Sequence, residues 1–389
     1  MKVCAIIAEY NPLHLGHLKQ IDYVKNVLGA EKTIVIMSGN FTQRGEPAIM
    51  NKYKRAKQAV TLGVDAVIEL PAVFATSNAE VFAKGAVSIL NSLGVVDGIC
   101  FGVESGEKED YLSLAAAMND ESKEFKKSLR EKLETGISLA KAKFEALKSI
   151  GRTDLKESLI SSPNNILGLE YTKAILSLNS NIEIFPLKRD GDHNDLTLKK
   201  GITSAKSIRA RIKAGKAKKI KKYLPKNVYG DLSPYPYAFD NIIMSHAMTA
   251  SAEKLELTPD CTEGLENRIK ALLKDNLTME KFIEKVSTKR YTQTRITRIL
   301  TNNLLGITKT LVKDAVSAPM YAKILATDSD SDILSLICAN SSIPVLTRKS
   351  DTAELKKTAA ACFEIDVLAN ELYNLVCGEK ENENQTLFI

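Results

Sequence analysis

The feature that most constrains the fold is a regular alternation of short apolar runs and amphipathic segments in the first half of the chain. The apolar runs are rich in β-branched residues and occupy residues 3–8, 33–37, 66–70, 98–101 and 182–187. Continuous runs of this length are typical of strands buried on both faces of a parallel sheet. Helix-like segments lie between them, near residues 15–28, 51–62, 78–93 and 165–178. This order predicts an α/β fold built on a doubly wound parallel sheet.

The chain has 389 residues, which suits two domains better than one. We expect a first domain over residues 1–230, with a helical insertion at about 107–149 where charged, helix-like sequence contains no strand pattern. A Pro/Tyr/Gly-rich junction follows, and residues 231–389 have a mostly helical pattern with one short apolar run at 343–346. The polar tail from residue 378 is expected to be loose until its last three residues.

Charge is distributed unevenly along the chain. The formal net charge is +7, yet residues 231–389 hold 18 Lys and Arg against 22 Asp and Glu. The surplus comes from Lys188–Lys226, which has 14 basic and three acidic residues. Such a cluster suits an anionic partner, either a nucleotide phosphate or a nucleic acid. A solvated helix face is the alternative explanation.

The six cysteines are scattered singly, with no CxxC pair and no His at metal-ligand spacing: Cys4, Cys100, Cys261, Cys338, Cys362 and Cys377. We therefore expect no metal site, no disulfide framework and no disulfide-linked partner, in keeping with a reducing cytoplasm. No run approaches the ~20 apolar residues of a membrane span. The N-terminus turns polar after a run too short for a signal peptide.

The chemistry is concentrated in the turn after the first expected strand, which reads AEYNPLHLGHLKQ over residues 8–20. Ligands of open α/β sheets bind at the carboxyl ends of the strands. His14 and His17 lie three residues apart at a helix start, so they share one face beside an anion-binding helix N-terminus. Gly16 leaves room for a nucleotide to approach the backbone. The pattern predicts that both histidines stabilise a triphosphate and its leaving pyrophosphate. The alternative is that they are surface or core histidines without a catalytic role, because an HxGH string by itself is weak evidence of function.

Longer motifs carry a family resemblance. HLGH after VCAIIAEYNP resembles the HxGH motif of the adenylyltransferase superfamily. The stretch at residues 37–87, with SPNNILGLEYTKAI (162–175) and ITSAKSIR (202–209), resembles the bacterial tRNA(Met) cytidine acetate ligase family. The match is sharpest over the first 230 residues and continues less sharply to the C-terminus. It implies a Rossmann-like (HUP) nucleotidyltransferase domain that makes acetyl-adenylate from acetate and ATP. The acetyl group then passes to N4 of the wobble cytidine of elongator tRNA(Met).

Strand-end positions and the resemblance together predict the ATP contacts. Gly102 ends one strand, where a missing side chain admits a ribose or adenine, and Arg189 ends another, where it can pair with phosphate. Asn164 or Asn165 caps the next helix, and the resemblance implies that Asn165 also contacts ATP. The full expected set is Ile7, Ala8, Glu9, Tyr10, Asn11, Pro12, Gly16, Gly102, Asn165, Arg189, Ser204, Ser207 and Arg209.

The last three residues of that set belong to a second helix start, TSAKSIRAR, where hydroxyls, backbone N–H groups and Arg209 can converge on phosphates. It takes the place of the KMSKS string of class I aminoacyl-tRNA synthetases, which is missing here. Gln43, Arg44 and Glu46 follow the second strand and could shape a carboxylate pocket, or simply be loop polarity. Mg²⁺ is expected to accompany ATP, although no acidic cluster marks a metal site.

Two basic features could guide RNA. The first is the segment 287–300, in which a cluster surrounds an aromatic residue suited to stacking on an unpaired base: Lys289, Arg290, Tyr291, Arg295 and Arg298. The second is the Lys199–Lys226 run. A solvated amphipathic helix is the alternative for the first feature.

Two other functions remain open at this point. One is transfer of adenylate to a small metabolite, although such enzymes usually need only the sheet domain. The other is a non-catalytic RNA-binding protein with a degenerate nucleotide fold, although the intact HLGH and ITSAKSIR strings argue against decay.

Overall fold

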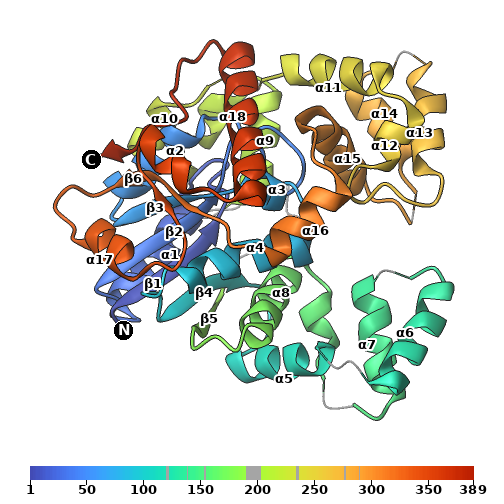
Figure 1. Ribbon diagram of the computed structural model, residues 1–389, viewed down its shortest axis with the longest axis horizontal. Coiled ribbons are helices and arrows are strands. Elements are labelled where there is room, and N and C mark those ends of the chain that lie inside the picture. Colours follow the sequence, from blue (N-terminus) through green and yellow to red (C-terminus); the bar gives the residue numbers. More distant parts are fainter. Residues whose placement is uncertain are drawn as a thin grey trace.

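The computed structural model describes residues 1–119, 122–137, 139–152, 155–189, 203–233, 236–275, 277–288 and 290–389. Its centre is a twisted sheet with the strand order β5-β4-β1-β2-β3-β6-β7, in which β8 also pairs with β6 (Figure 1). The first five strands run parallel, and β6 runs antiparallel to β3. The strands are β1 (Val3–Ala8), β2 (Lys32–Ser38), β3 (Ala66–Leu70), β4 (Gly98–Val103), β5 (Glu183–Lys188), β6 (Ala322–Thr327), β7 (Val345–Leu346) and β8 (Leu387–Phe388). The α/β class is confirmed.

The strand order reverses at β1. The chain builds outward from β1 through β2 and β3 on one side, then returns to add β4 and β5 on the other. In open α/β sheets this reversal separates the crossover helices and leaves a crevice at the carboxyl ends of the two central strands. The carboxyl ends of β1 and β4 are therefore the expected place for a ligand.

Alternate residues of the central strands point into two separate cores, as the pleat of a strand requires. One core receives Val3, Ala5, Ile34 and Ile36 and is covered by α4 (Ala79–Ser92) and α8 (Pro163–Ser177). The opposite core receives Cys4, Ile6, Val35 and Met37 and is covered by α1 (Leu15–Asn26), α2 (Lys52–Thr61) and α9 (Ala205–Lys213). Burial on both faces explains why these strands read as continuous apolar runs.

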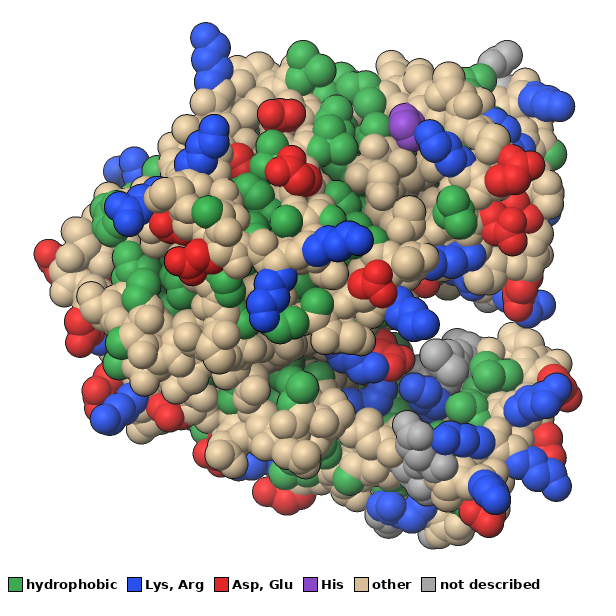
Figure 2. Space-filling model, in the orientation of Figure 1, with side chains coloured by type: hydrophobic (Ala, Val, Ile, Leu, Met, Phe, Trp, Pro, Cys, Tyr) green, Lys and Arg blue, Asp and Glu red, His purple; other side chains and the backbone are tan. Residues whose placement is uncertain are grey.

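The insertion between β4 and β5 is helical, as expected. It contains α5 (Lys108–Met118), α6 (Lys123–Glu134), α7 (Leu139–Ser149) and the 3₁₀ turn η1 (Glu157–Ile160). Helix α5 packs on α8, whereas α6 and α7 pack on each other and project from the body. Figure 2 shows a notch between this projection and the helices that follow residue 230.

The segment after residue 230 is mostly helical but also completes the sheet. Its main helices are α11 (Ala238–Thr249), α12 (Ala252–Glu256), α13 (Leu265–Leu273), α14 (Met279–Val286), α15 (Gln293–Leu305), α16 (Lys309–Ser317), α17 (Ile333–Asn340) and α18 (Lys357–Cys377). Strands β6, β7 and β8 return to the sheet beside β3. Both halves of the chain thus share one sheet and contribute to both of its cores, and the two-domain division at residue 230 stays a prediction.

The expectation of a loose polar tail is wrong. Glu383 is buried, with 5% of its surface exposed, and its Oε1 accepts a hydrogen bond from Lys52 Nζ at 2.7 Å. Lys323 of β6 pairs with the same carboxylate and with Glu69 of β3, at 3.2 Å from the latter. A polar composition predicted disorder, but charged tail residues that find buried partners become part of the core.

All six cysteines are free thiols, and four of them are buried. Within the described ranges, no helix combines the length and apolar character needed to cross a membrane.

Candidate active site

His14 and His17 form a reciprocal cap on the first turn of α1. His14 is the N-cap residue, and its Nδ1 accepts a hydrogen bond from Gly16 N at 3.0 Å. Nδ1 of His17 accepts one from His14 N at 3.3 Å. The two rings stack with centroids 3.8 Å apart and an interplanar angle of 15°. The HxGH spacing therefore fixes both rings through contacts with backbone only two or three residues away.

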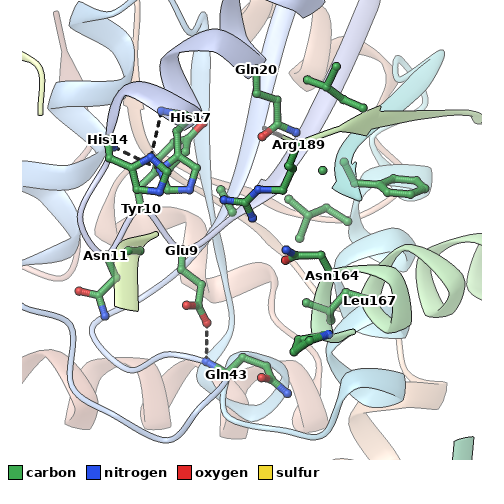
Figure 3. Close-up of a pocket in the computed structure, with 18 of the residues that line it drawn as sticks. Glu9, Tyr10, Asn11, His14, His17, Gln20, Gln43, Asn164, Leu167 and Arg189 are labelled. Atoms are coloured by element: carbon green, nitrogen blue, oxygen red, sulfur yellow. Dashed lines mark hydrogen bonds between the residues drawn. The ribbon is translucent and has the colours of Figure 1, made fainter. Parts of the chain in front are cut away.

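These hydrogen bonds determine which nitrogen carries the proton. Because Nδ1 is the acceptor on both rings, a neutral imidazole must carry its hydrogen on Nε2. Both rings line the same cavity (Figure 3). The turn thus supplies two fixed N–H donors at a helix N-terminus, where an anion is favoured.

A buried arginine fixes the strand ends beside this turn. Arg55 of α2 donates to the carbonyl oxygens of Glu9 (2.6 Å), Ser38 (3.0 Å) and Met50 (3.0 Å), and also to that of Gly39. Burial lowers the pKa of Arg55 to about 10. The guanidinium ties the carboxyl end of β1 to that of β2. Sequence reasoning missed this residue, because an arginine in a helix pattern indicates a solvent-facing position.

Arg209 brings the start of α9 to the same turn. Its Nη1 donates to the carbonyl oxygen of Asn11 at 2.9 Å, and its Nε lies 3.6 Å from a carboxylate oxygen of Glu46. The side chain of Asn11 in turn accepts from Ile49 N at 3.0 Å. The two expected phosphate-binding segments, nearly 200 residues apart in sequence, are therefore in direct contact.

One cavity at the carboxyl ends of β1 and β4 collects most of the expected residues (Figure 3). Those that line it are Ile7, Ala8, Glu9, Tyr10, Asn11, His14, Gly16, His17, Gly102, Arg189 and Arg209. Lining side chains that the sequence did not single out include Lys19, Gln20, Tyr23, Phe82, Phe101, Leu167, Tyr171 and Leu187, while Lys188 and Lys206 belong to the basic segment described above. Most of these residues come from α1, α4, α8 and α9, which the topology brings to the sheet edge. No local pattern marks them.

Asn165 does not line the cavity. Its side chain is buried and accepts from Glu104 N at 2.9 Å, while its Nδ2 donates to Ser105 Oγ (2.8 Å) and to the Ser158 carbonyl oxygen (2.9 Å). It holds the loop after β4 in place. The neighbouring Asn164 faces the cavity and donates to a carboxylate oxygen of Glu104 at 2.6 Å. The geometry favours a positioning role for Asn165.

Pro12, Ser204 and Ser207 also lie outside the cavity lining among the described residues. Ser204 is the N-cap of α9, and its Oγ accepts from Ser207 N at 3.1 Å. The wall at this helix start is made by Ala205, Lys206 and Arg209. The two serines therefore shape the helix start from behind the wall.

Gly102 and Arg189 occupy neighbouring strand ends and constrain each other. A Cβ atom added to Gly102 would lie 2.9 Å from Cδ of Arg189. The missing side chain thus makes room for the arginine, which points into the cavity (Figure 3). Burial lowers the pKa of Arg189. A partly desolvated guanidinium of this kind is well suited to pair with a phosphate or a carboxylate.

The loop after β2 presents Gln43 and Arg44 to the cavity. The backbone N–H of Gln43 donates to Oε1 of Glu9 at 2.8 Å, and the Gln43 side chain donates to the Ser77 carbonyl oxygen at 3.1 Å. Glu46 pairs with Arg209 and is not among the lining residues. Two of the three loop residues considered in the sequence therefore reach the cavity.

Helix α15 supports this loop from behind. Gly45 has φ 76°, and a Cβ there would lie 2.6 Å from Arg298 N. Thr301 donates to the Gly45 carbonyl oxygen at 2.6 Å. Arg298 is buried, and its side chain donates to Oδ2 of Asp260 at 2.9 and 3.1 Å, while Arg295 donates to the Asp260 carbonyl oxygen. These internal contacts count against direct RNA binding by the two arginines.

The other members of that basic cluster face the same acidic loop. Arg290 pairs with Glu263, and the Tyr291 hydroxyl donates to a carboxylate oxygen of Glu263 at 3.1 Å. The Arg295 guanidinium lies 5.0 Å from the Tyr291 ring centroid. Lys289 lies outside the described residues. The basic residues at the start of α15 are therefore paired with Asp260 and Glu263 of the loop before α13.

The described part of the Lys199–Lys226 run, unlike the cluster at residues 290–298, has exposed lysines. It runs along α9 and the 3₁₀ turn η2 (Ala217–Tyr223) to α10 (Lys226–Gly230). Its exposed cations are Lys213, Lys216, Lys218, Lys219, Lys221, Lys222 and Lys226. Helix α9 begins in the cavity wall with Ala205 and Lys206, and this row of exposed lysines follows that helix start in sequence.

Within the described ranges, no three His, Cys, Asp or Glu side chains are placed to hold a metal ion together.

The fold and the paired histidines define a nucleotidyltransferase of the HxGH class. A family model for HIGH nucleotidyl transferases matches residues 1–387. The chain belongs to this family and, within it, to the tRNA(Met) cytidine acetate ligases. A relative of that name from Clostridium acetobutylicum is 37% identical, and the match covers 97% of this chain and 96% of the relative. Another, from Acetivibrio thermocellus, is 38% identical over 96% and 94% of the two chains.

Solved structures support the same assignment. The crystal structure of Thermotoga maritima TmcAL bound with alpha-thio ATP superposes with a TM-score of 0.91 at 29% identity, and both chains are fully covered. The apo form of that protein superposes with a TM-score of 0.93, again at 29% identity and full coverage. The family and fold expected from the motifs are confirmed.

Proposed function

We propose that this protein is an ATP-dependent acetate ligase that acetylates N4 of the wobble cytidine of elongator tRNA(Met). The observation that carries the proposal is the reciprocal cap of His14 and His17, which gives two Nε2–H donors on one cavity wall. The names of its relatives supply the acetate and the tRNA, and the T. maritima structure supplies a bound ATP analogue.

In the first half-reaction, an acetate oxygen attacks the α-phosphorus of ATP and pyrophosphate leaves with the electrons of the broken P–O bond. Acetate is already ionised at neutral pH, so no general base is needed. Donors fixed before the reaction stabilise the charge that builds on the phosphoryl oxygens without reorganising. His14, His17, Arg189 and Arg209 are the cavity residues that fit this role.

In the second half-reaction, cytidine N4 attacks the acetyl carbon of acetyl-adenylate. A C–N bond forms, the bond to the AMP oxygen breaks and N4 releases one proton. The cavity must therefore open wide enough for a base extruded from a single-stranded loop, the form in which RNA bases are usually recognised. Mg²⁺ would enter bound to the ATP phosphates, since the described residues build no site of their own.

We place the RNA path along the lysines of α9 and η2. Their ammonium groups are exposed, whereas Arg295 and Arg298 are held by Asp260. Phosphates of an anticodon stem can be neutralised by such a row without any base contact. Four buried, unpaired cysteine thiols accord with a cytoplasmic location, where glutathione keeps thiols reduced.

The test separates the two half-reactions. Labelled pyrophosphate should exchange into ATP when acetate is present and tRNA is absent, and N4-acetylcytidine should appear in the nucleosides of elongator tRNA(Met) once tRNA is added. Exchange that depends on a different small substrate would indicate adenylyl transfer to a metabolite. Absence of exchange and of N4-acetylcytidine under all these conditions would indicate a non-catalytic RNA-binding protein.

A further inference from the structure

One side chain in the cavity has the wrong charge for the first half-reaction. Six of the described lining residues are Lys or Arg, namely Lys19, Arg44, Lys188, Arg189, Lys206 and Arg209. Against these, Glu9 is the one acidic side chain among the described lining residues. Both substrates of the first half-reaction, ATP and acetate, are anions that a carboxylate repels. A carboxylate at this place suits a group that donates hydrogen bonds rather than a phosphate or an acetate.

Glu9 is held in place by hydrogen bonds to its backbone carbonyl and to one of its carboxylate oxygens. Its backbone carbonyl accepts from Arg55 at 2.6 Å, and its Oε1 accepts from Gln43 N at 2.8 Å. Within the described part of the chain, no cationic side chain lies within ion-pair distance of its carboxylate. Its negative charge adds to burial in raising the pKa of Tyr171 across the cavity. The second oxygen of this carboxylate is therefore available to a hydrogen-bond donor on a substrate.

The position of Glu9 relates it to the reacting atoms. It is the first residue after β1, five residues before His14, and Figure 3 shows its side chain between the two histidines and Gln43. In the proposed first half-reaction the histidines contact the α-phosphate, and the acetyl carbon of acetyl-adenylate is two bonds from that phosphorus. The group that approaches this carbon is the exocyclic amine of cytidine, which carries two N–H donors.

We propose that Glu9 is the catalytic base of the acetyl-transfer step, an inference that rests on the function proposed above. The amine lone pair is delocalised into the cytosine ring, so N4 is a weak nucleophile until it loses a proton. As N4 forms its bond to the acetyl carbon, one N4 proton passes to a Glu9 carboxylate oxygen. AMP leaves with the electrons of the broken C–O bond, and Glu9 later releases the proton to solvent. Proton acceptance of this kind typically contributes about 10²–10⁴-fold in rate.

The variant Glu9→Gln tests this role, because glutamine keeps an oxygen that can accept from Gln43 N but cannot take a proton. Acetate-dependent pyrophosphate exchange and the transfer of acetyl groups to tRNA are measured on the same preparation. Transfer should fall at least ~10²-fold more than exchange. Its rate should also rise with pH as hydroxide replaces the lost base, and Glu9→Asp should recover part of it.

The possible results are distinguishable. Wild-type protein that shows neither exchange nor N4-acetylcytidine overturns the proposed function itself. With an active wild type, equal losses of exchange and transfer in Glu9→Gln, accompanied by a raised KM for ATP, would mean that Glu9 binds the amine of adenine instead. Unchanged transfer in that variant would exclude any role for the carboxylate.

Discussion

Nζ of Lys52 lies 2.7 Å from Oε1 of Glu383, although 331 residues separate the two in sequence. Lys52 also contacts Glu69 at 2.7 Å, and Lys323 contacts both carboxylates. All four side chains are almost completely buried. Two cations and two anions thus neutralise each other between β3, β6, α2 and the C-terminal tail.

Glu383→Ala should strongly destabilise the protein, because it leaves two buried ammonium groups with one carboxylate. Breaking a buried pair in this way typically costs about 3–5 kcal/mol. Urea unfolding measures the loss. The matched control is Glu379→Ala, which breaks a contact to the more exposed Lys54 and should cost at most about 1 kcal/mol. Similar losses in the two variants would show that the tail does not neutralise this cluster.

His17→Ala should lower acetate-dependent ATP turnover by well over ~10²-fold, the usual effect of removing one preorganised donor to a charged transition state. The fold should survive, since His17 caps a helix start and lies at the cavity wall. His246→Ala, on α11 and outside the cavity lining, is the control and should retain its activity. Normal turnover in a folded His17→Ala variant would refute the site assignment.

The row of lysines on η2 should carry much of the attraction for tRNA. Replacing Lys218, Lys219, Lys221 and Lys222 with Gln should weaken tRNA binding and flatten its salt dependence, by about 0.7–0.9 in log–log slope for each phosphate that is no longer neutralised. Acetate-dependent pyrophosphate exchange, measured without tRNA, reports whether the ATP site stays intact.

The double variant Arg295→Ala, Arg298→Ala is the natural comparison. It also removes cationic side chains, but these arginines bind Asp260 inside the helical segment. We expect a loss of stability and an unchanged salt slope for tRNA binding. The opposite result, a stable protein with a flattened slope, would move the RNA path to α15.

Asp366→Asn should change how stability depends on pH. Burial, aided by the charge of Glu69, raises the pKa of Asp366 to about 8. An unfolded aspartate ionises near pH ~3.9, so between about pH 4 and 8 the folded state binds the extra proton. The stability due to this group is complete below about pH 4 and is lost as pH rises toward 8, by at most about 1.4 kcal/mol for each pH unit. An asparagine side chain cannot ionise, so the variant should gain on the wild type between about pH 5 and 8.

The control for that experiment is Asp351→Asn. Burial alone would raise the pKa of Asp351, but hydrogen bonds from Thr347 and Arg348 lower it to about 2. The stability from this group is present above the unfolded value and is lost only as pH falls toward about 2. Urea unfolding should therefore find a constant difference from wild type between about pH 5 and 8. A constant difference for Asp366→Asn as well would show that Asp366 stays ionised in the core.

The strands that could be predicted are those with a strong local pattern. The runs at 3–8 and 66–70 coincide with β1 and β3, and the other three parallel strands differ by two residues or fewer at either end. β6 was missed because its six residues stand among helical segments and pair antiparallel with a strand about 250 residues earlier. The residues next to β6 in the sequence do not indicate that it pairs with β3.

The candidate site divides in the same way. Contacts over two or three residues build the HxGH turn, so its spacing alone places both imidazoles at the helix start. Arg55, Arg298 and Glu383 bear charges that ordinarily indicate solvent, and each is buried on partners far away in sequence.

By itself, the sequence determined the parallel sheet, the family and the paired histidines, because hydrophobic periodicity and helix capping act over a few residues. Only the tertiary structure decided which charged side chains are buried and which face the cavity. Lys19 lines the cavity, whereas the expected ATP contact Asn165 holds the loop after β4, and Arg298, an expected RNA contact, pairs with Asp260. The physical reason is that a charge is stable in the interior only beside its partners, and the fold of the whole chain determines where those partners lie.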